Sequence, residues 1–472
     1  MKKAISIILV VILTASCMGV ASSGAGYGTL PVMDQAQWDT YFASVSNGVG
    51  LCELTPGSDI SAMNFSWHTS AQIEPVVYIA DNSLMENAVE FTGTSKSTQE
   101  GAFANRVSAT GLEQNTLYYY TYGVAGSVST PESFQTGDEH DFTFLYMGDV
   151  HVSDGTEEGN TLSGTSMTWS NTLSKILNAN GQIDFAVSVG DQASAGLGTE
   201  MAGFYAAVPL RNLPIATVIG NHEKKAFEFG YYGNRPNEFK GMGTSFIGGD
   251  NWFTYGDVLF LTIDSTNGSG IDHYDFVSDA VEKNPDARWR ICLLHHDLYG
   301  GAYSEADSDN QLIAKVLNPI FEDFDIDFVL QGHSHYYGRT HGLVNGGIVE
   351  DYTDAAEITD PSGTVFMVSG SVNRYHYDTY PATPSKVIVK NCVVNDILYT
   401  TINVKDDSVC IETRTLSDHA VVDSLTVTKT EENTFDDVNA PSIVTVFIGF
   451  AGTLYAVFDK IIKLIRSINI EL

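Results

Sequence analysis

The sequence predicts two folded domains, an all-β sandwich at residues 28–137 and an α/β domain at residues 138–430. In the first region, short runs of alternating apolar and polar residues are separated by Gly, Ser and Asn, which is typical of a small sandwich. From residue 141 onwards, apolar runs alternate with amphipathic stretches, and this rhythm predicts sheets covered by helices. The 472 residues, 43% of them hydrophobic and 17% charged, suffice for two or three globular domains.

The net charge of the chain is strongly negative, −34 at pH 7. This acidic excess argues against nucleic acid as the main partner, because a phosphate backbone needs Lys and Arg on the protein surface. A small substrate that contains phosphate is still compatible with it, since bound metal ions reverse the local field.

The first residues have the pattern of a secretory signal peptide, which we place at residues 1–25. Two lysines precede an apolar run at residues 5–13, and small residues follow it, with cleavage expected after Ala21 or Ala25. Lipidation of Cys17 is an alternative. The protein is therefore expected outside the cytoplasm, either secreted or at the cell surface.

The end of the chain consists of an acidic linker at residues 431–440 and a segment at residues 441–472 that begins apolar and ends amphipathic. No charged residue occurs from 440 to 458, and basic residues follow. At a rise of ~1.5 Å per residue, this uncharged stretch just spans a bilayer core. Two interpretations stay open: a membrane anchor, or an amphipathic helix that lies at an interface or packs on the domain.

The sandwich region contains no catalytic cluster of side chains. His68 is isolated in a strand-like run and is expected to be structural. Of the cysteines, Cys292 lies in an apolar run and is expected to be a buried thiol. Cys392 and Cys410 lie in neighbouring strand-like segments and could form a disulfide.

Residue types that bind metals recur at the carboxyl ends of the apolar runs in the α/β region. Open α/β sheets place their ligands at the carboxyl ends of strands. Six of the twelve histidines fall at these ends, which histidines scattered over a surface would not do. The residues are Asp149, His151, Asp191, Asn221, His222, His295, His296, His333 and His335.

The spacing and chemistry of these residues predict a transition-metal site in which one carboxylate could be shared by two ions. Asp149 and His151 are two positions apart, as are His333 and His335, so both members of a pair can face the same side in extended backbone. Carboxylate, amide and imidazole ligands together suit Fe, Mn or Zn better than Ca or Mg. One shared carboxylate can hold two ions ~3.5–4 Å apart, a geometry that supports phosphoryl transfer to water.

The order of the motifs D-x-H, GD, GNHE, H-x-[P/D] and GHxH resembles that of the calcineurin-like metallophosphoesterases. The β-rich lead region is similar to the fibronectin type III-like domain of purple acid phosphatases. Two further stretches resemble that branch, GHSHYYGRT and NWFTYGDVLFLTID. The resemblance covers residues 27–429 and implies that the α/β domain has the four-layer α/β/β/α architecture of the family.

The resemblance also implies a role for each motif residue. One metal ion would be held by Asp149, His151, Asp191 and His335, and the other by Asp191, Asn221, His295 and His333. Asp191 and a solvent hydroxide would bridge the two ions, and the hydroxide would attack phosphorus. His222 would be the catalytic residue that stabilises the phosphate charge or protonates the leaving group. His296 is a weaker candidate for a substrate contact, and Glu223 is expected to orient a histidine.

Two features depart from the purple acid phosphatases. Ser194 stands where those enzymes have a metal-binding tyrosine, so no tyrosinate ligand is expected and Fe(III) is not required. The stretch LYGGAYSEADSDN after the fourth motif lacks the histidines that contact substrate in those enzymes. These departures leave the metal identity and the choice between monoesters and diesters open.

We therefore expect an exported, metal-dependent phosphoesterase similar to an acid phosphatase, acting on a small phosphate ester. A phosphodiesterase or nucleotidase of the same family is the first alternative. The second alternative is a surface binding or adhesive protein built on an inactive esterase scaffold. The complete set of ligand positions argues against the second alternative.

Overall fold

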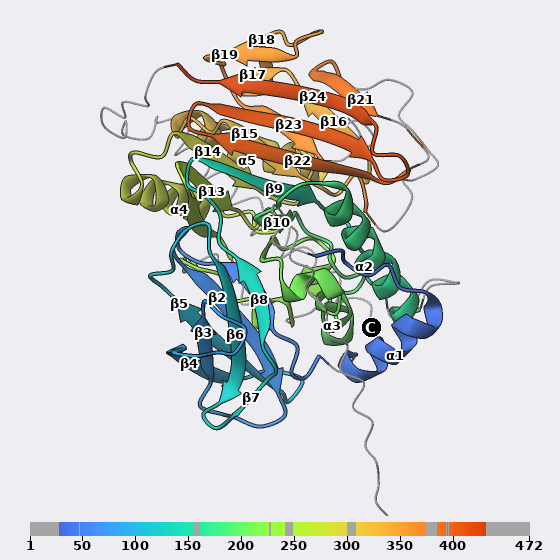
Figure 1. Ribbon diagram of the computed structural model, residues 1–472. Helices are drawn as coiled ribbons and strands as arrows, with labels where there is room; N and C mark the ends of the chain where they lie inside the picture. Colours follow the sequence, from blue (N-terminus) through green and yellow to red (C-terminus); the bar gives the residue numbers. More distant parts are fainter. Residues whose placement is uncertain are drawn as a thin grey trace, which may run out of the picture.

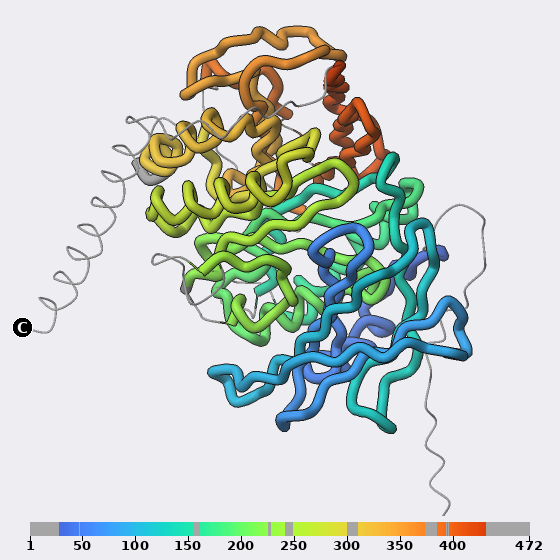
Figure 2. The backbone as a smooth tube through the Cα atoms, turned by 90° about the vertical axis from the view of Figure 1, so that its left-hand side faces the viewer, coloured from blue at the N-terminus to red at the C-terminus, as the bar shows by residue number. Residues whose placement is uncertain are grey.

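The computed structural model describes residues 28–46, 48–153, 161–225, 228–240, 249–299, 308–372, 385–392, 394 and 396–430. Within them a β-sandwich lies at one end of a larger α/β domain (Figures 1 and 2). The expected signal peptide, acidic linker and C-terminal segment lie outside the described residues. In the described part, no helix combines the length and apolar character needed to cross a membrane.

The sandwich has eight strands: seven follow one hydrogen-bonded path in the order β1-β2-β5-β4-β3-β6-β7, and β8 lies off this path and pairs with β6. Its core is aromatic and includes the buried residues Phe65, Trp67, Tyr120 and Phe134. The strands are β1 (Glu53–Pro56), β2 (Met63–Thr69), β3 (Val76–Ala80), β4 (Val89–Ser97), β5 (Phe103–Ala109), β6 (Leu117–Val124), β7 (Ser127–Val128) and β8 (Glu132–Gln135).

The expectation that residues 28–137 are entirely β is wrong at their start, where helix α1 (Gln35–Val45) forms. A reciprocal cap begins it: Asp34 accepts a hydrogen bond from the Gln37 backbone N–H, and the Gln37 side chain accepts one from that of Asp34. Trp38 and Phe42, one turn apart, are buried against Leu162 and Ala206 of the α/β domain. Trp38 and Phe42 are four positions apart, as on one face of a helix, but two apolar residues in so short a segment did not predict a helix.

The α/β domain contains two seven-stranded sheets, ordered β11-β10-β9-β22-β23-β24-β19 and β12-β13-β14-β15-β20-β16-β21. Strands β9 to β11 are parallel in the first sheet, and β13, β14, β15 and β20 are parallel in the second. Strands of the first sheet are β9 (Asp141–Met147), β10 (Phe185–Ser188), β11 (Ile215–Thr217), β19 (Glu357–Thr359), β22 (Leu398–Lys405), β23 (Ser408–Thr415) and β24 (Val421–Thr428). Strands of the second are β12 (Asn251–Tyr255), β13 (Val258–Thr262), β14 (Trp289–Leu293), β15 (Phe328–Gln331), β16 (Tyr337–Thr340), β20 (Val365–Val368) and β21 (Ile388–Cys392), while β17 (Gly342–Val344) and β18 (Gly347–Glu350) pair with each other.

Three apolar cores show that this domain has four layers. The central core, with residues such as Phe144, Phe185 and Phe260, lies between the two sheets. Helices α2 (Leu162–Ala179) and α3 (Gly198–Tyr205) cover the first sheet, and α4 (Gly270–Lys283) and α5 (Ser308–Asp323) cover the second. Short 3-10 helices occur at Val208–Arg211, Glu223–Lys225 and Glu228–Tyr231. The predicted α/β/β/α architecture is confirmed.

Polar contacts join the sandwich to the segment that follows the GNHE motif. The Glu53 carboxylate accepts a hydrogen bond from the Gly233 backbone N–H at 2.6 Å. Arg106 donates to the Gly230 carbonyl at 2.6 Å, and Asn64 donates to the Asn234 carbonyl at 2.7 Å. The sandwich thus holds a part of the α/β domain that begins close to the predicted site.

The cysteines of the described residues are free thiols. Cys292 is buried in β14, as the sequence predicts. Cys392 lies on β21 and Cys410 on β23, which belong to different sheets, so the disulfide that the sequence allowed is not formed.

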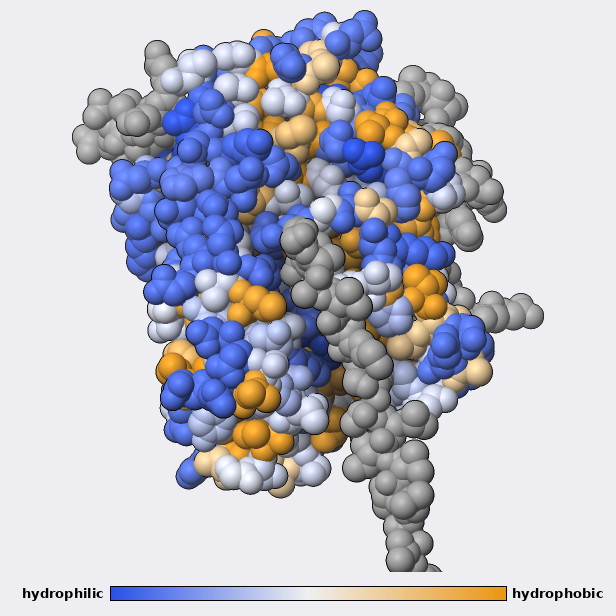
Figure 3. All heavy atoms as spheres, in the orientation of Figure 1, coloured by the Kyte–Doolittle hydropathy of each residue, from blue (hydrophilic) through white to orange (hydrophobic). Residues whose placement is uncertain are grey.

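The face shown in Figure 3 is mostly hydrophilic on the side of α4, and its hydrophobic residues are spread in small groups. Exposed large apolar residues of the described part are scattered over both domains, for example Leu84 in the sandwich and Ile271 on α4. Scattered apolar residues are normal on a protein surface, and in the described part of the chain they indicate no docking site.

Candidate metal centre

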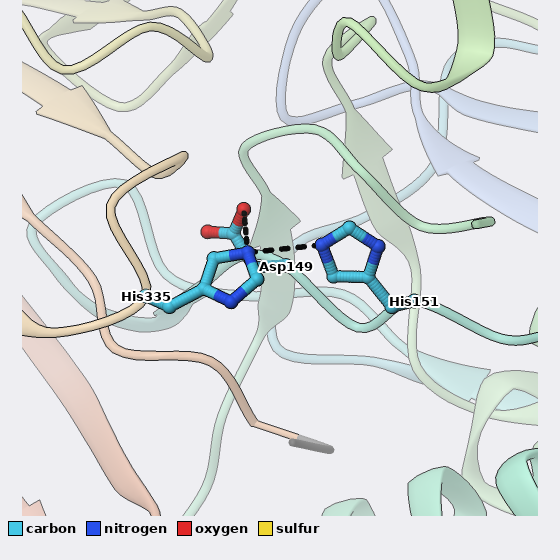
Figure 4. Close-up of side chains that lie close together, drawn as sticks. All are labelled: Asp149, His151 and His335. Atoms are coloured by element: carbon cyan, nitrogen blue, oxygen red, sulfur yellow. Dashed lines mark hydrogen bonds and ion pairs between the residues drawn. The ribbon is translucent and has the colours of Figure 1, made fainter. Parts of the chain in front are cut away.

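The residues predicted to bind metal come together at the carboxyl ends of strands from both sheets. Asp149, Asp191 and Asn221 follow β9, β10 and β11 of the first sheet, whereas His295 and His333 follow β14 and β15 of the second. Because the sheets pack face to face, the loops that leave these strands meet. Figure 4 shows Asp149, His151 and His335 pointing toward one another.

Five of the seven predicted ligands have a left-handed backbone. The φ angles are 54° for Asp149, 49° for His151, 50° for Asp191, 74° for His333 and 62° for His335. Residues other than glycine avoid this region, and the strain persists only where the surrounding structure imposes it. Such strain concentrates at functional sites, and here it directs side chains from sharp turns after the strands toward a common point.

The first group of converging atoms comes from Asp149, His151 and His335, all buried. The Nε2 atoms of His151 and His335 are 3.0 Å apart, and His335 Nε2 is 3.4 Å from Asp149 Oδ1. Burial lowers the pKa of His151 to about 3, so its ring is neutral. A neutral ring and a carboxylate facing one point supply lone pairs for a cation.

The second group is formed by Asn221, His295 and His333. Asn221 Oδ1 is 2.9 Å from His295 Nε2 and 3.0 Å from His333 Nδ1. His295 Nδ1 lies 2.8 Å from the Val189 carbonyl, to which it donates its proton. Once its Nε2 proton is lost, His295 would direct the lone pair of Nε2 into the space that it shares with Asn221 and His333, as a metal-binding histidine does.

Asp191 lies between the two groups. Its Oδ2 is 3.7 Å from His151 Nε2 and 3.2 Å from His295 Nε2. The structure thus brings all seven predicted ligands together, with one carboxylate shared. Their carboxylate, amide and imidazole donors fit a pair of Fe, Mn or Zn ions.

The charges in this cluster stabilise one another. Burial alone would raise the pKa of Asp191, but the imidazoles of His295, His151 and His222 hold it well below its usual range. Burial likewise disfavours the charged form of His295, yet the carboxylate of Asp191 raises the pKa of His295 to about 10. A metal ion can replace such protons, because its ligands bind in the deprotonated form. The cluster is therefore suited to hold positive charge.

His222 lies at the edge of the first group, with its ring centroid 4.8 Å from that of His151. Its Nδ1 donates to the carbonyl of Ser194, which leaves Nε2 3.8 Å from Asp191 Oδ2. The side chain is 29% exposed, whereas that of His295 is fully buried. His222 is therefore the accessible histidine of this group, as expected for a residue that meets substrate.

His296 packs against the second group. Its ring centroid is 5.0 Å from that of His333 and 5.5 Å from that of His295. Ser265 Oγ lies 2.8 Å from His296 Nδ1 and 3.2 Å from its backbone nitrogen. Burial lowers the pKa of His296 well below its usual value, so the ring is neutral.

Comparison with known proteins gives the family of this site. Residues 142–337 match the family model of the calcineurin-like phosphoesterases, and residues 52–136 match that of the purple acid phosphatase N-terminal domain. The chain carries a calcineurin-like phosphoesterase domain. The first model runs from β9 to the first residue of β16 and includes all seven predicted ligands.

Two of the similar solved structures share the fold over most of the chain. The purple acid phosphatase PPD1 from yellow lupin (Lupinus luteus) seeds matches with a TM-score of 0.63 at 17% identity, over 84% of this chain and 76% of that chain. PhoD matches with a TM-score of 0.53 at 13% identity, over 89% of this chain and 98% of that chain. At these identities the likeness concerns the fold. With the family of the catalytic domain, it supports a phosphatase-type hydrolase.

Within the phosphoesterase domain, Glu223 has a different task from the one expected. It does not orient a histidine. Its buried carboxylate accepts hydrogen bonds from the backbone N–H groups of Asp191, Ala193 and Gly220, at 2.9, 2.9 and 2.8 Å. The residue that orients His222 is Ser194, through its backbone carbonyl. A backbone contact of this kind leaves no trace in the residue type.

Sequence reasoning missed Ser265, which holds His296 in the phosphoesterase domain. A signal was present, because Asp264 and Ser265 follow the apolar strand β13 at its carboxyl end, as the predicted ligands follow theirs. The Val189 carbonyl that fixes the His295 ring gives no such signal, since every residue has a carbonyl.

Proposed function

We propose that the protein hydrolyses phosphate esters at a dinuclear transition-metal centre and that His222 is its catalytic side chain. The observation that carries this proposal is the position of Asp191 Oδ2 between two groups of ligand atoms, 3.7 Å from His151 and 3.2 Å from His295. The proposed ligands are Asp149, His151, Asp191, Asn221, His295, His333 and His335. The metal ions are Fe, Mn or Zn.

When bound, two such ions lower the pKa of water and neutralise the charge of a phosphoryl group. The residues of the chain do the positioning. Ser194 fixes the ring of His222 through Nδ1, so Nε2 is directed toward the site and can donate a proton to a leaving group or a hydrogen bond to a phosphoryl oxygen. Glu223 fixes the loops of Asp191 and Asn221 by accepting hydrogen bonds from the backbone N–H groups of Asp191 and Gly220.

Acid phosphatase-like hydrolysis of monoesters is our first choice, and a phosphodiesterase or nucleotidase is the alternative. The complete set of ligands argues against an inactive scaffold that only binds a surface. A panel of monoesters and diesters, with Mn, Zn and Fe supplied separately, distinguishes the two activities. Hydrolysis of diesters alone would contradict the first choice.

The decisive test is the variant Asp191→Ala, compared with Asp286→Ala, which removes an exposed carboxylate after α4. We expect Asp191→Ala to lose bound metal and activity while its circular dichroism stays that of the folded protein. Asp286→Ala should keep both. Full turnover by Asp191→Ala would contradict the metal assignment. Fewer than one transition metal per wild-type chain after repletion would favour the inactive scaffold.

We also propose that the protein is exported and that its C-terminal segment associates with membranes. The basic and apolar start of the chain and the uncharged stretch at residues 440–458 support this. The N-terminal sequence of the mature protein should begin after Ala21 or Ala25. Truncation before Ala440 should release the protein from membranes, and release of the full-length chain by a carbonate wash would contradict a spanning segment.

A further inference from the structure

Lys224 connects the loop of one predicted ligand to the loop that holds His296. It is exposed and follows the GNHE motif, and its backbone N–H donates to the Gly220 carbonyl at 3.3 Å, which closes a turn around Asn221. Its Nζ donates to the Thr266 carbonyl at 2.8 Å. The side chain therefore runs from the Asn221 loop to the β13–α4 loop and carries a positive charge along the edge of the second ligand group.

The proton of His296 has a defined position, set by the same β13–α4 loop. Ser265 Oγ accepts a hydrogen bond from the His296 backbone N–H at 3.2 Å. Among the described residues, the acceptor for the single Ser265 hydroxyl proton is His296 Nδ1, at 2.8 Å. The ring therefore carries its own proton on Nε2, which makes Nε2 a hydrogen-bond donor.

His296 and His222 contact different ligand groups, and Lys224 reaches the carbonyl of Thr266, which follows the Ser265 that holds His296. His222 packs against His151 of the first group, whereas His296 packs against His333 of the second. The proposed function already assigns His222 to the scissile phosphate and its leaving group. The proposed function assigns no role to the Lys224 ammonium or to the His296 ring N–H.

The negative charge of the molecule makes a cation near the site important for binding an anionic substrate. A chain with a net charge of −34 repels anions in general, so a cation at the edge of the site raises the local concentration of an anionic substrate where it matters. The charge of Lys224 acts on His296, since it adds to the burial and the neighbouring histidines that lower the pKa of that ring. An ammonium and an N–H donor near each other recognise an anionic oxygen better than a neutral group of the same shape.

We propose that Lys224 and His296 form a subsite for a second anionic group of the substrate, so that the preferred substrates are phosphate esters with a further carboxylate or phosphate. This inference rests on the proposed function and specifies its substrate class. Lys224 and His296 are specificity-determining residues, and Ser265 is a positioning residue that acts through His296. The metal ligands themselves do not discriminate between phosphate esters with and without a second anionic group.

The test compares esters of equal shape that differ in one charge, namely 3- and 4-carboxyphenyl phosphate against the 3- and 4-carbamoylphenyl phosphates. We expect the wild-type holoenzyme to prefer one of the carboxylates by about tenfold in kcat/KM, mostly through KM, because a carboxylate accepts a stronger, charge-assisted hydrogen bond than a neutral amide does; tenfold is about 1.4 kcal/mol. Lys224→Met should lower the preference to about one, and Lys224→Arg should retain most of it.

The matched control is Lys283→Met, which removes the same charge from the exposed end of α4, where Lys283 pairs with Asp279 at 2.7 Å. It should keep the preference. An equal loss in Lys224→Met and Lys283→Met would overturn the subsite in favour of a long-range charge effect. Equal kcat/KM of wild type for the charged and neutral esters would also overturn it.

A second measurement does not depend on turnover. Calorimetry should show that carboxybenzylphosphonate binds the wild-type holoenzyme about tenfold more tightly than carbamoylbenzylphosphonate, and that Lys224→Met removes the difference. If neither ester is hydrolysed and neither phosphonate binds, the proposed function is wrong and the inference falls with it. If both esters are hydrolysed and both phosphonates bind equally, the inference alone is overturned.

Discussion

Glu223 holds Asp191 in place through its backbone: Oε2 of Glu223 accepts the hydrogen bond of the Asp191 N–H at 2.9 Å. The same oxygen accepts the Gly220 N–H at 2.8 Å, and Oε1 accepts that of Ala193 at 2.9 Å. One buried side chain therefore joins the loops after β10 and β11. The geometry of the shared ligand depends on a residue that does not itself belong to the ligand groups.

Glu223→Gln should impair metal binding and activity even though the side chain keeps its shape. The amide places an NH₂ group against backbone N–H donors, so at least one buried donor loses its acceptor, at a cost of about 1–3 kcal/mol of folding free energy. Loss of such a supporting contact typically lowers metal affinity or activity about 10–100-fold. Metal titration and kcat/KM measure this, with Glu282→Gln on the exposed face of α4 as the control. Wild-type metal affinity in Glu223→Gln would contradict the supporting role.

The protein should lose stability as pH rises from 4.5 to 7, because Glu53 is buried where the sandwich contacts the phosphoesterase domain. Burial raises the pKa of Glu53 from 4.5 to about 7. Because the folded state binds this proton more tightly than the unfolded state, the free energy of unfolding falls as pH rises through this window. Ionisation of Glu53 then costs up to about 3 kcal/mol of stability above pH 7.

The variant Glu53→Gln tests this with a definite sign. The hydrogen bonds from Ser66 and Gly233 both go to Oε2, and Oε1 faces His68 Nδ1 at 3.7 Å. A glutamine can keep both bonds on its oxygen and turn its NH₂ toward His68. Urea unfolding should show that Glu53→Gln is more stable than wild type at pH 8 and similar to it at pH 5. The exposed variant Glu86→Gln should show no such difference, and destabilisation of Glu53→Gln at pH 8 would contradict the argument.

The ion pair of His273 and Asp250 should stabilise the loop that carries Ser265 up to neutral pH and fail above it. His273 Nδ1 lies 2.6 Å from Asp250 Oδ2 and Nε2 lies 3.0 Å from the Asn267 carbonyl, so both ring nitrogens face acceptors. Burial disfavours the imidazolium, but Asp250 outweighs it and raises the pKa of His273 from 6.5 to about 9. The folded state therefore holds the proton more tightly. The stabilisation, about 3 kcal/mol, is complete below pH 6.5 and is lost as pH rises to 9.

The comparison of wild type with His273→Gln by urea unfolding at pH 6 and at pH 9.5 measures this contribution. We expect a large difference in the free energy of unfolding at pH 6 and a small one at pH 9.5. The exposed His140→Gln should differ much less from wild type than His273→Gln does at pH 6. A difference for His273→Gln that is independent of pH would show that the ring stabilises the protein by packing and not by charge.

Ligand residues lie at the carboxyl ends of apolar strands, which the sequence shows, so they could be predicted. The residues that hold them in place could not. Asp149 and His151 follow an apolar run directly, so the local sequence fixes both their type and their place in the fold. The partner of His296 is Ser265, 31 residues away, and only the packed sheets bring the two together. Helix α1 was not predicted, because the burial of Trp38 and Phe42 depends on contact with the phosphoesterase domain. What a residue contacts across the core depends on tertiary packing, which periodicity does not encode.

His222 should act as a proton donor, and the choice of leaving group can distinguish this from simple stabilisation of charge. A positioned acid contributes about 10²–10⁴-fold when the leaving group needs a proton, and much less when it departs as a stable anion. His222→Ala should therefore lower kcat far more for phenyl phosphate than for 4-nitrophenyl phosphate. The side chain is 29% exposed, so its removal leaves no large cavity in the core and the fold should survive. The exposed histidine variant His140→Ala should leave both rates unchanged. An equal loss for both esters would assign His222 to charge stabilisation, and no loss for either would remove it from the catalytic machinery.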